Sequence, residues 1–217
     1  MDLNYVSTRN GQDKYTASQA ILKGLADDGG LFVPTSVPVL DVDLKDMAAM
    51  SYQQVAYEVL KLFLTDFTKD ELMHCINSAY DSKFDTEEIA PLVFADGAYY
   101  MELFHGSTIA FKDMALSILP HLMITSARKN NIKNDIVILT ATSGDTGKAA
   151  IEGFSNVEGT RICVFYPENG VSDVQKAQMV TSDGKNVHVC AVKGNFDDCQ
   201  TAVKKAFNDL KNEPGLK

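Results

Sequence analysis

The sequence is short of positive charge. Its 217 residues contain 20 Lys and Arg against 29 Asp and Glu, which gives a formal net charge of -9. Such a chain has no general attraction for the phosphates of nucleic acids, so we do not expect a nucleic-acid partner. An anionic substrate would have to be held by a few local groups.

Long apolar runs are also lacking. The longest, such as the stretch at 136–141, have the length of a buried strand and fall far short of a membrane-spanning helix. Residues 1–16 contain no basic segment followed by an apolar one, so they do not resemble a secretory signal. We therefore expect no membrane association.

Cysteine and histidine are sparse. The four cysteines show no Cys-X-X-Cys spacing, and the four histidines are scattered along the chain. The cysteines predict reduced thiols in a cytoplasmic protein. The histidines predict no metal site.

Helical patterns dominate the first part of the chain. We expect helices near 16–26, 51–66 and 68–80, with capping residues at their starts. Residues 91–103 predict two short strands around an Asp96-Gly97 turn. These patterns predict a mostly helical N-terminal domain with a short β-hairpin, which we place at residues 1–94.

Strands and helices alternate in the second part, at residues 95–217. A helix over 109–129 is expected to be kinked or split at Pro120. Three apolar strands then alternate with helices, and they are expected at 136–141, 161–167 and 186–192. This alternation predicts an α/β fold, a three-layer parallel sheet with flanking helices. Because three strands make a small sheet, we expect the chain to be part of a longer protein.

A glycine-containing loop, Ala-Thr-Ser-Gly-Asp-Thr-Gly at 141–147, joins the first parallel strand to the next helix. Gly144 and Gly147 would let the backbone approach a ligand, and the helix N-terminus offers N–H groups to an anion. The loop is not a P-loop, which requires glycine at the position of Thr142 and Ser or Thr at that of Ala149. The alternative interpretation is a tight turn with a capping hydroxyl.

Lys112 lies within the stretch His-Gly-Ser-Thr-Ile-Ala-Phe-Lys-Asp-Met-Ala at 105–115. Ser107 or Thr108 is expected to cap a helix that begins near Ile109, which places Lys112 in its first turn. The helix dipole and apolar neighbours would both favour a neutral amine, the form that attacks carbonyls. Two alternatives remain: pairing with Asp113, or an ordinary lysine on a solvated helix face.

Four stretches together resemble the threonine synthases, a family of pyridoxal-phosphate enzymes. In chain order they are residues 5–10 with 17–34, then 105–116, 140–150 and 192–200. The first is specific to threonine synthases. The lysine segment and the loop occur more widely among enzymes related to the β subunit of tryptophan synthase.

The resemblance implies a fold of pyridoxal-phosphate type II, present incompletely, and a set of site residues. Lys112 would be the Schiff-base lysine, and Asp145 would lie beside the cofactor's ring oxygen and share a proton with it. The reaction would convert O-phospho-L-homoserine and water to L-threonine and phosphate. The substrate-binding candidates are Ser107, Thr108, Ser143, Gly144, Thr146, Gly147, Ser172, Lys176 and Gln178.

The resemblance also points to missing parts. In the family, the glycine-rich loop for the cofactor phosphate and the residue at the pyridine nitrogen come later than residue 217. We therefore expect residues 95–217 to be the first, smaller cofactor-binding domain, without the large domain that follows, and the chain alone to be inactive. Two other readings stay open, a threonine-synthase-like phospho-lyase and a non-catalytic module with this fold.

Overall fold

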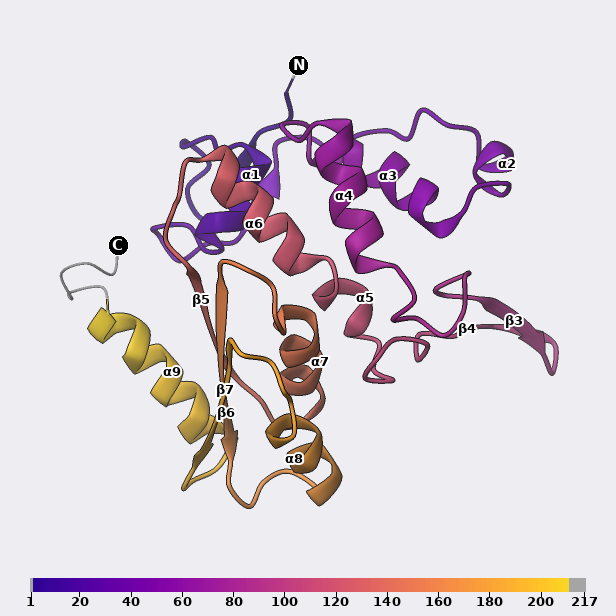
Figure 1. Cartoon of the computed structure of the whole chain (residues 1–217). Helices are drawn as coiled ribbons and strands as arrows, with labels where there is room; N and C mark the ends of the chain where they lie inside the picture. Colours follow the sequence, from indigo (N-terminus) through magenta and orange to yellow (C-terminus); the bar gives the residue numbers. More distant parts are fainter. Residues whose placement is uncertain (1, 211–217) are drawn as a thin grey trace. The chain divides into compact units, whose positions relative to one another are not determined.

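The computed structural model describes residues 2–210 (Figure 1). Its contacts divide the chain into two compact units. Unit 1 comprises the described residues up to His105 together with Ile118–Asn134, and unit 2 comprises Gly106–Ser117 together with the described residues from Asp135 onward. The domain boundary expected after residue 94 falls within unit 1, and it stays a prediction about family domains.

Unit 1 contains helices and two small antiparallel sheets. Its elements are β1 (Tyr5–Ser7), α1 (Ala17–Lys23), β2 (Phe32–Pro34), α2 (Leu44–Met47), α3 (Tyr52–Phe63), α4 (Lys69–Ala79), β3 (Leu92–Ala95), β4 (Ala98–Met101) and α6 (Leu119–Lys129). Strand β1 pairs with β2, and β3 pairs with β4 through the predicted Asp96-Gly97 turn. Both turn residues have positive φ, at 49° and 80°, as a two-residue hairpin loop requires.

Helix α4 supplies much of the core of unit 1. Its four buried residues, Leu72, Cys75, Ile76 and Ala79, recur at the spacing of a single helix face. The helix begins at the predicted capping box, in which Thr68 accepts from the N–H of Glu71 and the Glu71 side chain accepts from the N–H of Thr68. The apolar face packs against α3 and α6.

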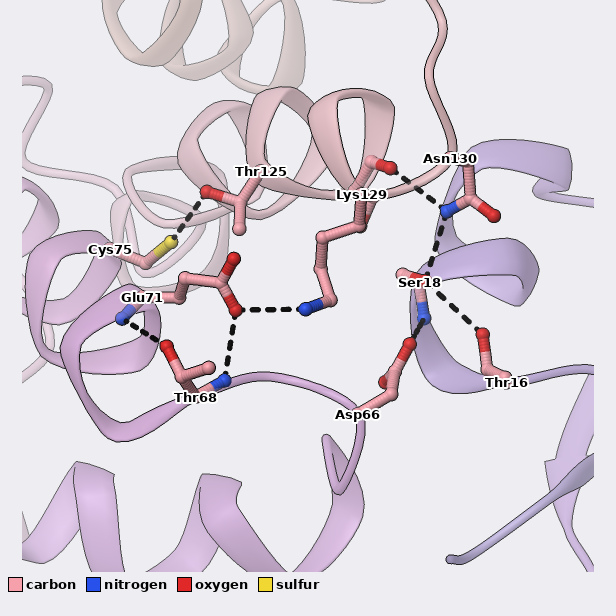
Figure 2. Close-up of polar contacts among 10 residues, drawn as sticks. Thr16, Ser18, Asp66, Thr68, Glu71, Cys75, Thr125, Lys129 and Asn130 are labelled. Atoms are coloured by element: carbon pink, nitrogen blue, oxygen red, sulfur yellow. Dashed lines mark hydrogen bonds and ion pairs between the residues drawn. The ribbon is translucent and has the colours of Figure 1, made fainter.

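Polar contacts connect α6 to α4 and α1 (Figure 2). The Lys129 ammonium lies 2.9 Å from Glu71 Oε2. One residue further on, Asn130 donates to Ser18 Oγ on α1 at 3.0 Å. Asp66 accepts from the Ser18 N–H at 3.2 Å. The three helices are therefore joined by directional bonds as well as by apolar packing.

Unit 2 contains the predicted α/β fold. Its elements are α5 (Asp113–Leu116), β5 (Ile136–Ala141), α7 (Asp145–Phe154), β6 (Thr160–Pro167), α8 (Asp173–Val180), β7 (Val187–Val192) and α9 (Phe196–Leu210). The three strands are parallel in the order β5-β6-β7. Figure 1 shows α9 on one face of the sheet and α7 and α8 on the other. Ile162 and Val164, on one face of the central strand, are fully buried, whereas Arg161 and Cys163 on the opposite face are exposed and half-buried.

One expectation about local structure is wrong. No helix begins near Ile109, because residues 106–112 form turns and α5 begins only at Asp113. The Asp113 carboxylate accepts from the Thr108 N–H at 2.8 Å and from the Thr108 hydroxyl at 2.6 Å, which holds the segment as a closed turn. The predicted break at Pro120 is confirmed, since α5 and α6 are separate helices and the proline lies in the first turn of α6.

Within residues 2–210, no helix combines the length and the apolar character that a membrane span requires.

The Glu71–Lys129 pair generates a testable prediction. Burial raises the pKa of Glu71, but the Thr68 N–H and the Lys129 ammonium outweigh it, so the net shift is downward. The stability that this carboxylate contributes is therefore present above its unfolded pKa and lost as the pH falls through the lower folded pKa. We expect Glu71→Gln to lower the free energy of unfolding by about 1–2 kcal/mol at neutral pH, with the difference shrinking below about pH 4.

Urea unfolding between neutral and acid pH measures this effect. Asp70→Asn is the matched control, because Asp70 is exposed in the same first helical turn. It should lose only its interaction with the helix dipole, about 0.5 kcal/mol. Equal losses in the two variants would show that the Lys129 pair contributes nothing.

Candidate functional site

The loop after β5 is organised by the buried hydroxyl of Thr142. This residue is 1% exposed, and its N–H donates to the carbonyl of Phe165 at 2.9 Å, which continues the pairing of β5 with β6. Its Oγ1 accepts from the N–H of Gly144 at 3.0 Å and from the N–H of Gly147 at 2.8 Å. One side chain thus fixes the path of the backbone from the end of the strand into α7.

The two glycines of this loop are required by its geometry. A Cβ at Gly147 would lie 2.4 Å from Thr142 Cγ2, too close for any side chain without displacing the hydroxyl that orders the loop. Gly144 has a φ of +145°, a conformation that side chains disfavour, and a Cβ there would lie 2.4 Å from Gln175 Nε2. Glycine at these two positions therefore lets the loop backbone lie directly against Thr142 and Gln175.

The N-terminus of α7 has unused donors. Within residues 2–210, the N–H groups of Asp145 and Thr146 in the first turn have no hydrogen-bond acceptor. The side chains of Ser143 and Thr146 are exposed beside them. Free N–H groups, hydroxyl groups and the positive end of the helix dipole together suit a bound carboxylate.

Asp145 is held from the neighbouring helix. Its Oδ1 accepts from Gln175 Nε2 at 2.8 Å. Gln175 lies in the first turn of α8 and forms a capping box with Ser172, the N-cap of that helix. Ser172, a candidate for binding the substrate's phosphate, therefore has its hydroxyl engaged at the start of α8.

Lys112 lies immediately before α5, beside exposed apolar side chains. Its Nζ is 4.3 Å from the centre of the Phe111 ring. Phe111 is 61% exposed and Ile109 is 72% exposed, so neither neighbour buries the lysine as the sequence suggested. Ile109 has a φ of +61°, which is rare for a β-branched residue, and strain of this kind concentrates at functional sites.

The alternative of a Lys112–Asp113 ion pair is not what the structure shows. Asp113 is 4% exposed, and both of its oxygens are engaged by Thr108. Among the residues that the structure describes, no carboxylate lies within ion-pair distance of Lys112 Nζ. The Lys112 amine is therefore available to a ligand. The Thr108 hydroxyl is not, because it donates a hydrogen bond to Asp113.

His105, the first residue of the stretch that contains Lys112, is held by two carboxylates. His105 Nδ1 lies 2.5 Å from Asp85 and its Nε2 lies 2.9 Å from Glu102. These hydrogen bonds, that to Glu102 first, raise the pKa of His105. Two hydrogen bonds thus fix His105, the residue at which this part of unit 1 ends.

Helix α7 connects the lysine segment and the loop. The loop leads into α7, and α5 packs against the same helix, with the Leu116 carbonyl lying close to Gly153. In the described part of the chain, no hydrogen bond joins Lys112 to residues 143–147. Ser107 and Lys176 are exposed and Gln178 is half-buried, and within residues 2–210 none of these three side chains makes a hydrogen bond or an ion pair.

Sequence reasoning missed Thr142 and Gln175. In the sequence, Thr142 is visible only as a departure from the P-loop pattern and as the residue that follows the apolar strand directly. Gln175 follows Ser172 by three residues, which is the capping-box spacing. What neither signal shows is the contact between Gln175 and Asp145, which are 30 positions apart.

Within residues 2–210, no group of three His, Cys, Asp or Glu side chains is placed to hold a metal ion.

The role of Thr142 is testable by an isosteric change. Thr142→Val keeps the shape but leaves two buried N–H groups without an acceptor, which should lower the free energy of unfolding by at least about 2 kcal/mol. Thr142→Ser keeps the hydroxyl and loses one methyl group, about 0.8 kcal/mol. Urea unfolding measures both, and amide exchange at Gly144 and Gly147 should accelerate only in the valine variant. Unchanged exchange there would contradict the assignment.

Residues 4–80 match the family model described as "Threonine synthase N terminus". The threonine synthase of Schizosaccharomyces pombe is 39% identical over 218 residues, which cover 96% of this chain and 42% of that protein. Threonine synthase-like 1 of Homo sapiens is 40% identical over 202 residues, covering 88% of this chain and 27% of that protein.

A crystal structure of threonine synthase from Brucella melitensis with bound PLP superposes with a TM-score of 0.87. The superposition has 39% identity and covers 97% of this chain and 45% of the other. The chain thus spans less than half the length of these relatives. The resemblance inferred from the sequence is confirmed: along nearly its whole length, the chain is similar to the N-terminal portion of the threonine synthases.

Proposed function

We propose that this chain is the N-terminal part of a threonine synthase that uses pyridoxal 5'-phosphate to convert O-phospho-L-homoserine and water to L-threonine and phosphate. The observation that carries the proposal is the similarity to threonine synthases over nearly the whole chain, which includes both the Lys112 segment and the loop at 142–147. It is supported by an available amine in the first and free N–H groups in the second.

The described residues fit the cofactor in part. Lys112 has no carboxylate partner in the described chain, and it lies beside the exposed ring of Phe111 and three positions after a strained residue, Ile109. When bound, pyridoxal phosphate supplies an electron sink for carbanions at the substrate's carbons. The proposed role of Lys112 is to hold the cofactor through Nζ and to move protons at that atom.

The loop that begins α7 is proposed to bind the substrate's carboxylate. Ser143 and Thr146 provide exposed hydroxyl groups, and Gly144 and Gly147 allow the backbone to come close to a ligand. Asp145 is proposed to lie beside the cofactor's ring oxygen. Two anionic oxygens in contact favour a shared proton, which this carboxylate would hold.

The remaining candidates are proposed with weaker support. Ser107 and Thr108 precede the lysine in the closed turn and are proposed to face the substrate. Ser172, Lys176 and Gln178 are proposed to hold the substrate's phosphate. Lys176 is exposed and carries the required charge, whereas the Ser172 hydroxyl already caps α8.

We propose a pyridoxal-phosphate type II fold for the whole protein and a cytoplasmic location. Residues 1–94 would form the mostly helical N-terminal family domain, which is supported by the family match at 4–80. Residues 95–217 would form the first cofactor-binding domain, which is supported by the parallel sheet at 136–192. These are proposed as family domains, since α6 packs within unit 1.

A second candidate is a threonine-synthase-like phospho-lyase, which releases phosphate without forming threonine. The observation that favours keeping it is the 40% identity to a threonine synthase-like protein, as high as the 39% identity to a threonine synthase. Incubating the full-length protein with O-phospho-L-homoserine and identifying the product separates the two. Threonine supports the first candidate, and a 2-oxo acid with ammonia supports the second.

Lys112 provides the decisive test of cofactor binding. We expect borohydride reduction of the full-length protein with pyridoxal phosphate to label the peptide that contains Lys112. Lys112→Arg keeps the charge but removes the nucleophilic amine, so it should abolish the label and lower turnover by at least about 10²–10⁴-fold. Lys193→Arg, at an exposed position after β7, is the control and should change neither. Label spread over surface lysines would overturn the assignment.

A further inference from the structure

We propose that Gln175 is a positioning residue whose side-chain amide holds Asp145 in place from α8. The consequence for catalysis rests on the proposed function, in which Asp145 lies beside the cofactor. The contact itself does not depend on that function.

Both ends of the Gln175 amide are engaged. Nε2 donates to Asp145 Oδ1 at 2.8 Å. Oε1 accepts from the Ser172 N–H and from the Ser172 hydroxyl, each at 3.2 Å. The side chain therefore joins the N-terminus of α7 to the N-terminus of α8.

The partners fix the orientation of the amide. A backbone N–H can only donate, so Oε1 must face Ser172. Nε2 then faces Asp145, where an ionised carboxylate oxygen can only accept. Turning the amide over would oppose two donors at Ser172 and two acceptors at Asp145, so the network assigns a single orientation.

Capping alone does not explain glutamine at this position. Glutamate serves equally well at the third position of a capping box, and its charge also suits a helix N-terminus. Glutamate would, however, place a second carboxylate against Asp145. The need for a donor toward Asp145 accounts for the amide.

The amide also lies directly against the loop. The position that a Cβ of Gly144 would occupy is 2.4–2.7 Å from three atoms of the Gln175 side chain. Gln175 thus contacts the loop backbone and binds the side chain of the next residue, Asp145. Within residues 2–210, Oδ1 of Asp145 accepts this one bond, and Oδ2 has no donor from the protein.

No cation competes for this role. In the described part of the chain, no Lys or Arg lies within ion-pair distance of Asp145, and Lys148, one turn further along α7, pairs with Glu152 at 3.1 Å. The carboxylate is therefore oriented by a neutral donor, which fixes its direction without neutralising it.

The test exchanges donor and acceptor between residues 175 and 145. Gln175→Glu keeps the capping box but loses the donor, and Asp145→Asn supplies a donor from the other side. Urea unfolding of the four combinations in the full-length protein measures the coupling without any activity. We expect Gln175→Glu to lower the unfolding midpoint when residue 145 is aspartate and to leave it unchanged or raise it when residue 145 is asparagine. Gln200→Glu makes the same substitution at an exposed position of α9 and should behave alike in both backgrounds.

A second measurement tests positioning. In the full-length protein with pyridoxal phosphate, Gln175→Glu should shift the pH midpoint of the cofactor's absorption band and lower kcat/KM about tenfold, a loss of 1.36 kcal/mol in transition-state stabilisation. Gln200→Glu should do neither.

The outcomes separate the two claims. Equal effects of Gln175→Glu in both backgrounds would overturn the contact, and the proposal with it. Coupling in unfolding without a shift of the absorption band would overturn the positioning role. If the unaltered protein shows neither a cofactor band nor threonine formation, the proposed function fails and the catalytic role fails with it, while the unfolding cycle still decides the contact.

Discussion

The hydroxyl of Thr142 is a single acceptor shared by two backbone N–H groups, and the geometry of the candidate site depends on it. It lies where the sheet ends, so the pairing of β5 with β6 places it and burial protects it from water. By accepting from Gly144 and Gly147, it sets the direction in which α7 begins. A loop with so little side-chain volume would otherwise be free to adopt many paths.

This fixed start of α7 has effects on both sides. Toward α8, it places Asp145 where Gln175 reaches it, so two neighbouring helices begin from one set of hydrogen bonds. Toward the solvent, it leaves the N–H groups of Asp145 and Thr146 without protein acceptors in the described chain. Helix α5, which directly follows Lys112, packs against the same helix α7. The packing of α7 thus supports both the loop, whose N–H groups at Asp145 and Thr146 are free, and the segment that carries the free amine of Lys112.

The Lys112 segment follows a different principle. Its shape comes from Asp113, which is buried and closes residues 108–113 into a turn through Thr108. The sequence suggested a helix here because Ser107 and Thr108 are residues typical of a helix N-cap. The structure has a turn instead, in which the N–H and the hydroxyl of Thr108 both donate to the Asp113 carboxylate. Such local side-chain bonds compete with helix formation. The strained φ of Ile109 accompanies that arrangement.

The sequence by itself determined the elements whose signals are local and repeated: the apolar strands and amphipathic helices of unit 2, the capping boxes, the Asp96-Gly97 hairpin and the break at Pro120. It also carried the resemblance to threonine synthases, because short motifs hold their residue types in order. Only the tertiary structure decided that Asp113 serves Thr108 rather than Lys112, that α6 packs with α1 and α4, and that Gln175 meets Asp145. These contacts join residues that periodicity does not relate. They depend on which helices the parallel sheet brings side by side and on which donors remain unpaired when it forms.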